Sequence, residues 1–204
     1  RDAAPQRVAA RDLPVEVQHR LSAPRPEFAG LAMARPAVMG ILNVTPDSFS
    51  DGGRFIDPAA ALSQARAMAE GADVLDIGGE STRPGAAEVE VAEEIARTAP
   101  VIAALRAAGL TTAISIDTRK GAVAQAALSA GAGIVNDVAA MGFDPAIAGV
   151  AAQAGAPIIL MHSIKTPATM QDDPVYDDVL LDVYDFLAAR IAQAEAAGIP
   201  AARI

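Results

Sequence analysis

Residues 38–53, VMGILNVTPDSFSDGG, decide the fold class. The apolar run 38–44 is typical of a buried parallel strand, and the loop after it is rich in Pro, Gly, Ser and Asp. An open nucleotide-binding sheet usually carries a G-x-G-x-x-G or G-x-x-x-x-G-K-[ST] pattern after its first strand. This loop matches neither pattern. The stretch therefore favours a closed barrel over an open, doubly wound sheet.

The same rhythm continues along the chain, because each short apolar run ends in polar residues and precedes an Ala-rich helical stretch. The expected strands are 38–44, 74–79, 113–117, 134–138 and 157–162. The expected helices are 58–71, 89–108, 120–130, 145–154 and 176–197. The alternation predicts an α/β fold, a TIM (β/α)8 barrel represented by about five βα units.

The domain organisation has two parts. Residues 1–37 are Pro-rich and weakly patterned, and we interpret them as an N-terminal extension with a short hairpin near 28–33. Residues 38–204 form a partial barrel. A complete barrel usually takes ~250 residues, so we expect the units after the fifth to be missing from this sequence.

Composition excludes several classes of function. The formal net charge is −9 and the pI is about 4.6, which argues against nucleic-acid or anionic-membrane partners. The chain has no cysteine, so disulfides, thiolate metal sites and cysteine nucleophiles are excluded. No apolar run reaches the ~18 residues of a membrane span, and the first 25 residues do not resemble a signal peptide. We expect a cytoplasmic protein.

Polar side chains end all five expected strands. They are Asn43, Asp76, Asp117, Asn136, Asp137 and His162. A single one is best explained as a loop cap, but the repetition favours a shared ligand site at the carboxyl ends of the strands. Carboxylates accept hydrogen bonds and amides both donate and accept, which suits a planar heterocycle with N–H and C=O groups. Met161 would add apolar surface. His162 is expected to be structural rather than a metal ligand, because no second His or Cys supports a site.

Two loops combine glycines and prolines with reactive side chains. They are 45–53 and 78–85. In the second loop, the guanidinium of Arg83 suits a phosphate or a carboxylate. The alternative for Arg83 is a salt bridge with Glu80 or another surface acid.

These motifs resemble dihydropteroate synthase. Residues 39–53 and 76–85 are similar to its first two signatures, and 115–118, 135–138, 160–162 and 167–171 continue the match in family order. The resemblance implies an enzyme that joins 6-hydroxymethyl-7,8-dihydropterin pyrophosphate to p-aminobenzoate and releases pyrophosphate, with Mg²⁺ as cofactor. It also implies a homodimer for the full-length protein.

The resemblance assigns roles residue by residue. Asn43 and Asp47 would lie at the Mg²⁺–pyrophosphate site. Thr82, Arg83 and Asp117 would be catalytic. The expected substrate-binding residues are Thr82, Asp117, Asn136, Asp76, Met161 and Phe49, with Phe49 covering the aminobenzoate ring.

Other family groups would lie on strands six to eight. The family places there an Asp, a Lys, an Arg and a His that this sequence lacks, so we expect the chain to be inactive alone. A methyltetrahydrofolate-binding methyltransferase barrel is one alternative, although it gives no reason for the loop with Thr82 and Arg83. A non-catalytic pterin-binding paralogue is the other alternative.

Overall fold

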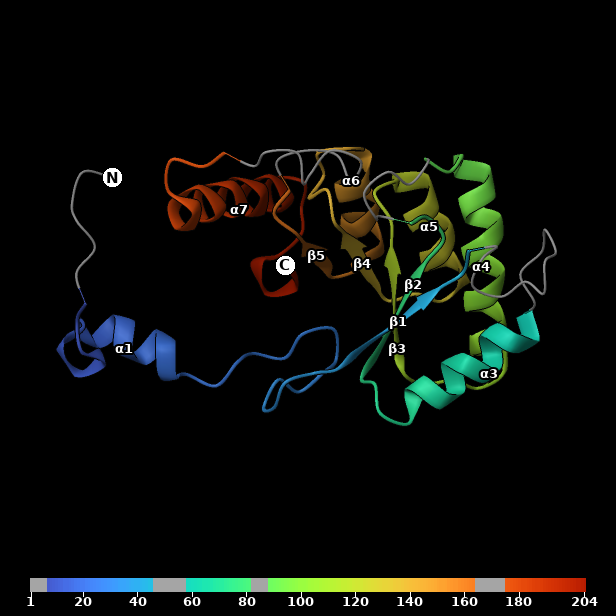
Figure 1. The fold of residues 1–204 in the computed structure, drawn as a ribbon, viewed down its shortest axis with the longest axis horizontal. Helices are drawn as coiled ribbons and strands as arrows, with labels where there is room; N and C mark the ends of the chain where they lie inside the picture. Colours follow the sequence, from blue (N-terminus) through green and yellow to red (C-terminus); the bar gives the residue numbers. More distant parts are fainter. Residues whose placement is uncertain (1–6, 46–57, 82–87, 164–174) are drawn as a thin grey trace.

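The computed structural model describes residues 7–45, 58–81, 88–163 and 175–204, and βα units dominate it (Figure 1). The strands are β1 (Met39–Asn43), β2 (Val74–Gly78), β3 (Ala113–Asp117), β4 (Ile134–Asp137) and β5 (Ile158–Leu160). The helices are α1 (Val15–Ser22), α3 (Pro58–Ala69), α4 (Val91–Ala107), α5 (Gly121–Ala130), α6 (Ala146–Ala154) and α7 (Val179–Ala196), with 3-10 turns η1 (Ala10–Asp12) and η2 (Ala201–Arg203). The elements from β1 to α7 agree with the sequence-based expectations to within three residues at each end.

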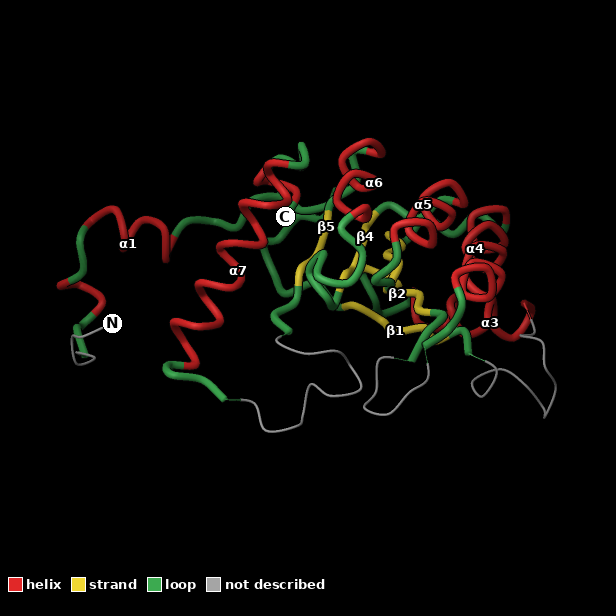
Figure 2. The backbone as a smooth tube through the Cα atoms, turned by 90° about the horizontal axis from the view of Figure 1, so that it is seen from above, coloured by secondary structure: helices red, strands yellow, loops and turns green. Residues whose placement is uncertain are grey.

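The sheet has the order β1-β2-β3-β4-β5, and every neighbouring pair is parallel. A doubly wound sheet reverses its strand order at a switch point, whereas a barrel wall keeps the order of the sequence. Helices α3 to α6 lie along one side of the sheet (Figure 2), and successive helices from α3 to α6 contact one another. This arrangement is that of a barrel wall with its outer layer of helices.

The main hydrophobic core lies between the sheet and these helices. Side chains alternate along each strand, so one set faces the helices. Leu42, Ile77 and Ile116 belong to this set and are fully buried. On the opposite face, Ile41 is 60% exposed. That face carries the candidate site described below.

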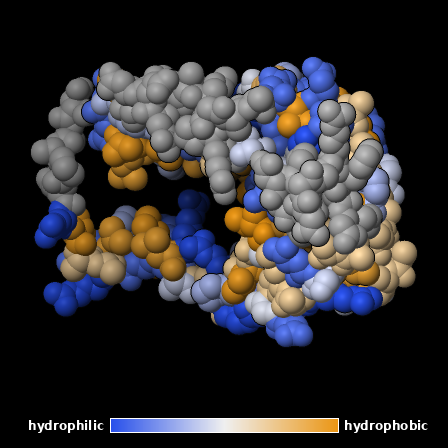
Figure 3. All heavy atoms as spheres, turned by 45° about the vertical axis from the view of Figure 1, so that its right-hand side comes forward, coloured by the Kyte–Doolittle hydropathy of each residue, from blue (hydrophilic) through white to orange (hydrophobic). Residues whose placement is uncertain are grey.

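The N-terminal extension contains a helix that the sequence did not predict. Helix α1 has no buried residue and exposes Val15 and Leu21. Helix α7 also exposes apolar side chains, among them Leu180 and Tyr184. Orange groups on the left of Figure 3 show the apolar character of this part of the surface.

A tight turn lies within the range where the sequence suggested a hairpin. Phe28 and Leu31 form an antiparallel bridge, with N···O distances of 3.1 and 2.8 Å. Phe28 lines a hollow together with Ile158, Ile159, Leu160, Leu187, Ile191 and Ile204. The extension therefore contacts the barrel at β5 and α7.

None of the described helices combines the length and apolar character that a bilayer span requires.

Asp144 joins the starts of two neighbouring helices. Its Oδ2 accepts a hydrogen bond from the N–H of Gly121 at 2.7 Å, and its Oδ1 accepts one from the N–H of Ala146 at 3.0 Å. The first N–H groups of a helix have no partner within the helix, so an acidic side chain stabilises them. One carboxylate thus fixes α5 relative to α6.

Gly79 allows the end of β2 to approach α4. A Cβ at this position would lie 2.8 Å from Cγ2 of Thr98 and 3.1 Å from Cγ of Glu94. Thr98 is fully buried, and its hydroxyl donates to the carbonyl of Glu94 at 2.8 Å. Glu94 is likewise buried, at 1% exposure.

We expect Gly79→Ala to lower the free energy of unfolding by about 1–3 kcal/mol, because the added methyl group overpacks this contact. Gly133→Ala is the matched control, since no atom lies within 4 Å of the Cβ there. The control should change the free energy by less than about 0.5 kcal/mol. Urea unfolding of the full-length protein measures both, and equal effects would contradict the packing argument.

Candidate active site

A row of side chains crosses four strands at the carboxyl edge of the sheet. The register pairs Asn43 with Gly78, Gly78 with Asp117, and Asp117 with Asn136. Positions paired in this way present their side chains to the same face. A Cβ built on Gly78 would lie 3.5 Å from Oδ1 of Asn43 and 3.5 Å from Oδ2 of Asp117. Asn43 and Asp117 therefore flank the space that glycine leaves open, as the sequence predicted.

Asp117 carries a buried oxygen with no donor. Its Oδ1 is inaccessible to solvent and has no hydrogen-bond partner among the described residues. Burial raises the pKa of Asp117 to about 7, and the nearby carboxylates, Asp76 foremost, act in the same direction. A buried acceptor without a partner costs free energy. A ligand that donates an N–H group to this oxygen would remove that cost.

Asp76 lies one step deeper on the same face, where β3 and β4 supply its partners. Ser115 donates its hydroxyl to Oδ1 of Asp76, and Nδ2 of Asn136 donates to Oδ2 at 3.0 Å. Burial raises the pKa of Asp76, while both hydrogen bonds lower it, and the net shift is upward. Our sequence reasoning gave Ser115 no role. Its place two residues before Asp117, on the same face of one strand, is the signal that would have identified it.

Asp137 was wrongly placed in this row by the sequence argument. Successive side chains of a strand point to opposite faces, so Asp137 points away from the face that Asn136 occupies. Its fully buried carboxylate accepts hydrogen bonds from the N–H groups of Ala139 at 2.9 Å and Met141 at 2.6 Å. Asp137 therefore stabilises the loop that follows β4 and does not face the row.

His162 and Met161 follow β5. The His162 ring packs edge-on against Phe186, with centroids 4.9 Å apart, and lies 5.9 Å from Tyr176. This contact with α7 fits the structural role expected for His162. Met161 is 41% exposed, so it can offer apolar surface.

Four of the expected site residues lie outside the described residues. They are Asp47, Phe49, Thr82 and Arg83.

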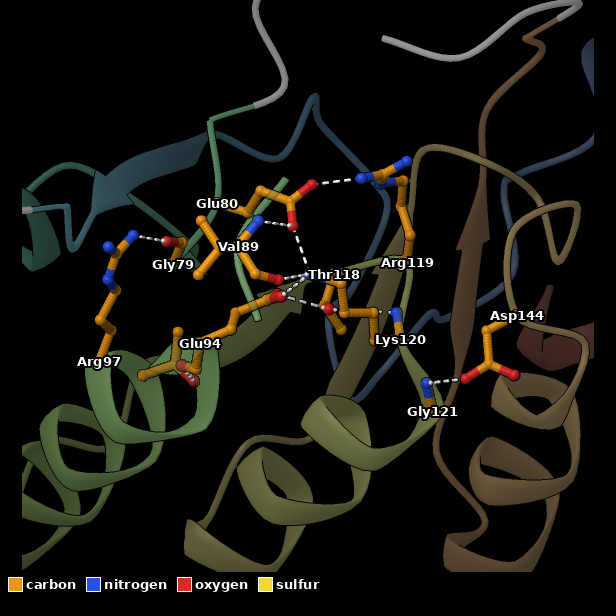
Figure 4. Close-up of polar contacts among 11 residues, drawn as sticks. Gly79, Glu80, Val89, Glu94, Arg97, Thr118, Arg119, Lys120, Gly121 and Asp144 are labelled. Carbon is orange, nitrogen blue, oxygen red and sulfur yellow. Dashed lines mark hydrogen bonds and ion pairs between the residues drawn. The ribbon is translucent and has the colours of Figure 1, made fainter. Parts of the chain in front are cut away.

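A buried network of charged side chains lies just after β2, between α4 and the start of α5 (Figure 4). The Lys120 ammonium contacts Glu80 and donates to Oε2 of Glu94 at 2.7 Å and to the carbonyl of Val89 at 2.5 Å. Lys120 is 4% exposed and Glu94 is 1% exposed. Burial lowers the pKa of Lys120, but the two carboxylates outweigh this effect and the pKa is raised.

The network also fixes both ends of the loop that follows β2. Glu80 pairs with Arg119 as well as Lys120, and its Oε2 accepts the N–H of Val89 at 3.3 Å. Arg97 donates to the carbonyl of Gly79 at 2.8 Å. Residues 79 and 80 are thus held close to residue 89. Our sequence reasoning did not identify this network and considered Glu80 only as a partner for Arg83.

A family model described as "pterin binding enzyme" matches residues 39–204. The chain belongs to this family. The family is built on the TIM barrel, so the expected fold class is confirmed, and the five strands form part of such a barrel.

Similar proteins in this family are dihydropteroate synthases. The enzyme of Synechocystis is 50% identical over 166 residues, which cover 81% of this chain and 57% of that protein. A probable bifunctional folylpolyglutamate synthase/dihydropteroate synthase of Haloferax volcanii is 56% identical over 165 residues, covering 80% of this chain and 19% of that protein. The structure of Xanthomonas albilineans dihydropteroate synthase with 4-aminobenzoic acid has a TM-score of 0.77 and 48% identity, covering 89% of this chain and 65% of that one. The chain thus spans less than two thirds of these relatives.

We expect Lys120→Met to lower the free energy of unfolding by about 3–5 kcal/mol, because it leaves the carboxylate of Glu94 buried without a cation and leaves Glu80 with Arg119 alone. Arg35→Met is the control. Arg35 pairs with Asp73 but is 67% exposed, so its loss should have a much smaller effect than the loss of Lys120. Denaturant unfolding of the full-length variants measures the difference, and a small effect at Lys120 would show that the buried pairs contribute little.

Stability should fall with rising pH because of Asp117. Its pKa is about 7 in the folded state, against 3.8 for the free side chain. Between these values the folded state keeps a proton that the unfolded state loses, so Asp117 contributes a decline of at most about 1.4 kcal/mol per pH unit from pH 4 to 7. We expect Asp117→Asn to flatten the decline by that amount. Unfolding curves across this pH range test it, and identical slopes in both proteins would contradict it.

Proposed function

We propose that the full-length protein is a dihydropteroate synthase. The reaction would join 6-hydroxymethyl-7,8-dihydropterin pyrophosphate to p-aminobenzoate, forming 7,8-dihydropteroate and pyrophosphate. The observation that carries this proposal is the row of Asn43, Asp117 and Asn136, in which Asn43 and Asp117 flank the space above Gly78. The relatives of the chain are dihydropteroate synthases, which supports the same conclusion.

Asp117 and Asn136 would bind the pterin. They are neighbours across β3 and β4, and the unpartnered Oδ1 of Asp117 suits an N–H group of the heterocycle. Binding a donor there would stabilise the carboxylate form. Met161 is the other described residue proposed to line the substrate site. Asp76, whose two oxygens already accept hydrogen bonds from Ser115 and Asn136, would support the site through these neighbours.

The charge of Asp117 would also serve the chemistry. When the bond from the pterin methylene carbon to the pyrophosphate oxygen breaks, the electron pair leaves with pyrophosphate, and positive charge develops on the methylene and the ring. A carboxylate in a site of low polarity offsets that charge. The amine of p-aminobenzoate then forms the new C–N bond and releases a proton. No protein nucleophile is needed.

The residues present suit Mg²⁺ bound mainly through the substrate. Within the described residues, no cluster of three or more His, Cys, Asp or Glu side chains is suited to a metal. Mg²⁺ on a phosphate ester usually takes only one or two protein oxygens, and Oδ1 of Asn43 is a hard oxygen donor on the pocket edge. Asn43 would hold the Mg²⁺–pyrophosphate group, with Asp47 as a second ligand. When bound, Mg²⁺ would stabilise negative charge on the leaving group.

Further roles remain proposals from the family resemblance. Thr82 and Arg83 would contact the anionic end of the substrate, and Phe49 would cover the aminobenzoate ring. A homodimer and a cytoplasmic location are likewise predictions.

The full-length protein should release pyrophosphate when both substrates and Mg²⁺ are supplied. We expect Asp117→Ala to lower kcat/KM by about 100-fold or more, because it removes the charge that faces the developing cation. Arg35→Met should keep wild-type rates, because Arg35 pairs with Asp73 before the start of β2, whereas the row lies at the carboxyl ends of the strands. A protein that binds the pterin but never releases pyrophosphate would overturn the proposal in favour of a non-catalytic binding module.

A further inference from the structure

Asp76 is not available to a ligand in the way that Asp117 is. It is 5% exposed, and both of its oxygens already accept hydrogen bonds, one from Ser115 and one from Asn136. Ser115 is fully buried and is the register partner of Asp76. Asp76 therefore acts on the pocket through its neighbours rather than by direct contact with the substrate.

The hydrogen bond to Asp76 decides which end of the Asn136 amide faces the pocket. An amide has a donor end and an acceptor end, and a carboxylate can only accept. Because Nδ2 of Asn136 donates one of its two N–H groups to Asp76 at 3.0 Å, the acceptor Oδ1 and the second N–H group are left for a ligand. If the amide turned over, two acceptors would meet inside the buried pocket, which costs free energy.

We propose that Asp76 is a positioning residue that fixes the Asn136 amide with its carbonyl oxygen toward the bound ligand. This inference rests on the proposed function, since it concerns the same pocket. With Oδ1 of Asp117 beside it in the row, Asn136 presents a second acceptor. This side of the site then favours a heterocycle edge that carries adjacent N–H donors.

Three variants of the full-length protein separate positioning from charge. 6-Hydroxymethylpterin is the binding probe, measured by calorimetry. We expect Asp76→Ala to weaken its binding by about tenfold or more, since the Asn136 amide loses its fixed partner. Asp76→Asn should recover much of the affinity, because its amide oxygen can still accept from Asn136. Ser115→Ala, which leaves the Asn136 contact intact, should change binding by less than about threefold.

The kinetic pattern gives an independent readout. In Asp76→Ala the KM for the pterin pyrophosphate should rise while the KM for p-aminobenzoate stays near the wild-type value. A general loss of structure would change both constants. An Asp76→Asn protein as weak as Asp76→Ala would overturn the inference, because it would assign the effect to the charge of Asp76 and not to its acceptor oxygens.

An NMR measurement on the wild-type protein tests the inference without depending on whether any variant folds. In the NMR spectrum, one side-chain N–H of Asn136 should exchange slowly with solvent and be shifted downfield by its bond to Asp76, with or without the probe. Fast exchange of both protons would overturn the inference. If wild-type protein bound no pterin at all, the proposed function itself would fail, and this outcome is distinct from unchanged binding in Asp76→Ala.

Discussion

The register between β1, β2, β3 and β4 is the constraint on which the site depends. It aligns Asn43, Gly78, Asp117 and Asn136 at the same level of the sheet. A slip of one residue in a single strand would send that strand's polar group to the helix-covered face and bring an apolar one inward. The apolar side chains buried against α3 to α6 oppose such a slip, because Leu42, Ile77 and Ile116 would lose their core positions. Apolar packing against the helices on one face therefore keeps the polar side chains aligned on the other face.

The buried carboxylates on the inward face of the sheet and those behind β2 differ in how their charge is balanced. The inward face holds carboxylates with raised pKa values, Asp76 and Asp117, and no described cation pairs with either of them. The cations Arg119 and Lys120 instead pair with Glu80, whose pKa they lower against the opposing effect of burial. The acids on the inward face therefore have no cation partner among the described residues, whereas Glu80 and Glu94 are neutralised within the protein and hold the ends of a loop.

The sequence predicted the fold well because local patterns specify it. Apolar runs of four to seven residues marked the strands, and the absence of a phosphate-binding fingerprint favoured the barrel. The site was predicted in part, since Asn43, Asp117 and Asn136 do share a face. The prediction for Asp137 was wrong, because a position at the end of a strand does not fix the face to which the side chain points. The alternation of side chains along the strand would have excluded it. The network of Lys120 with Glu80 and Glu94 depends on contacts across 40 and 26 residues, which no local pattern encodes.

At Gly78, in the centre of the row, the requirements of folding differ from the requirements of ligand binding. A methyl group there would meet its neighbours at 3.5 Å, an ordinary contact distance that the sheet can accept. The same methyl group would occupy the gap between the Asn43 amide and the Asp117 carboxylate. The gap between these two side chains is therefore kept open by the absence of a side chain at residue 78, and a single added methyl group would fill it without disturbing the fold.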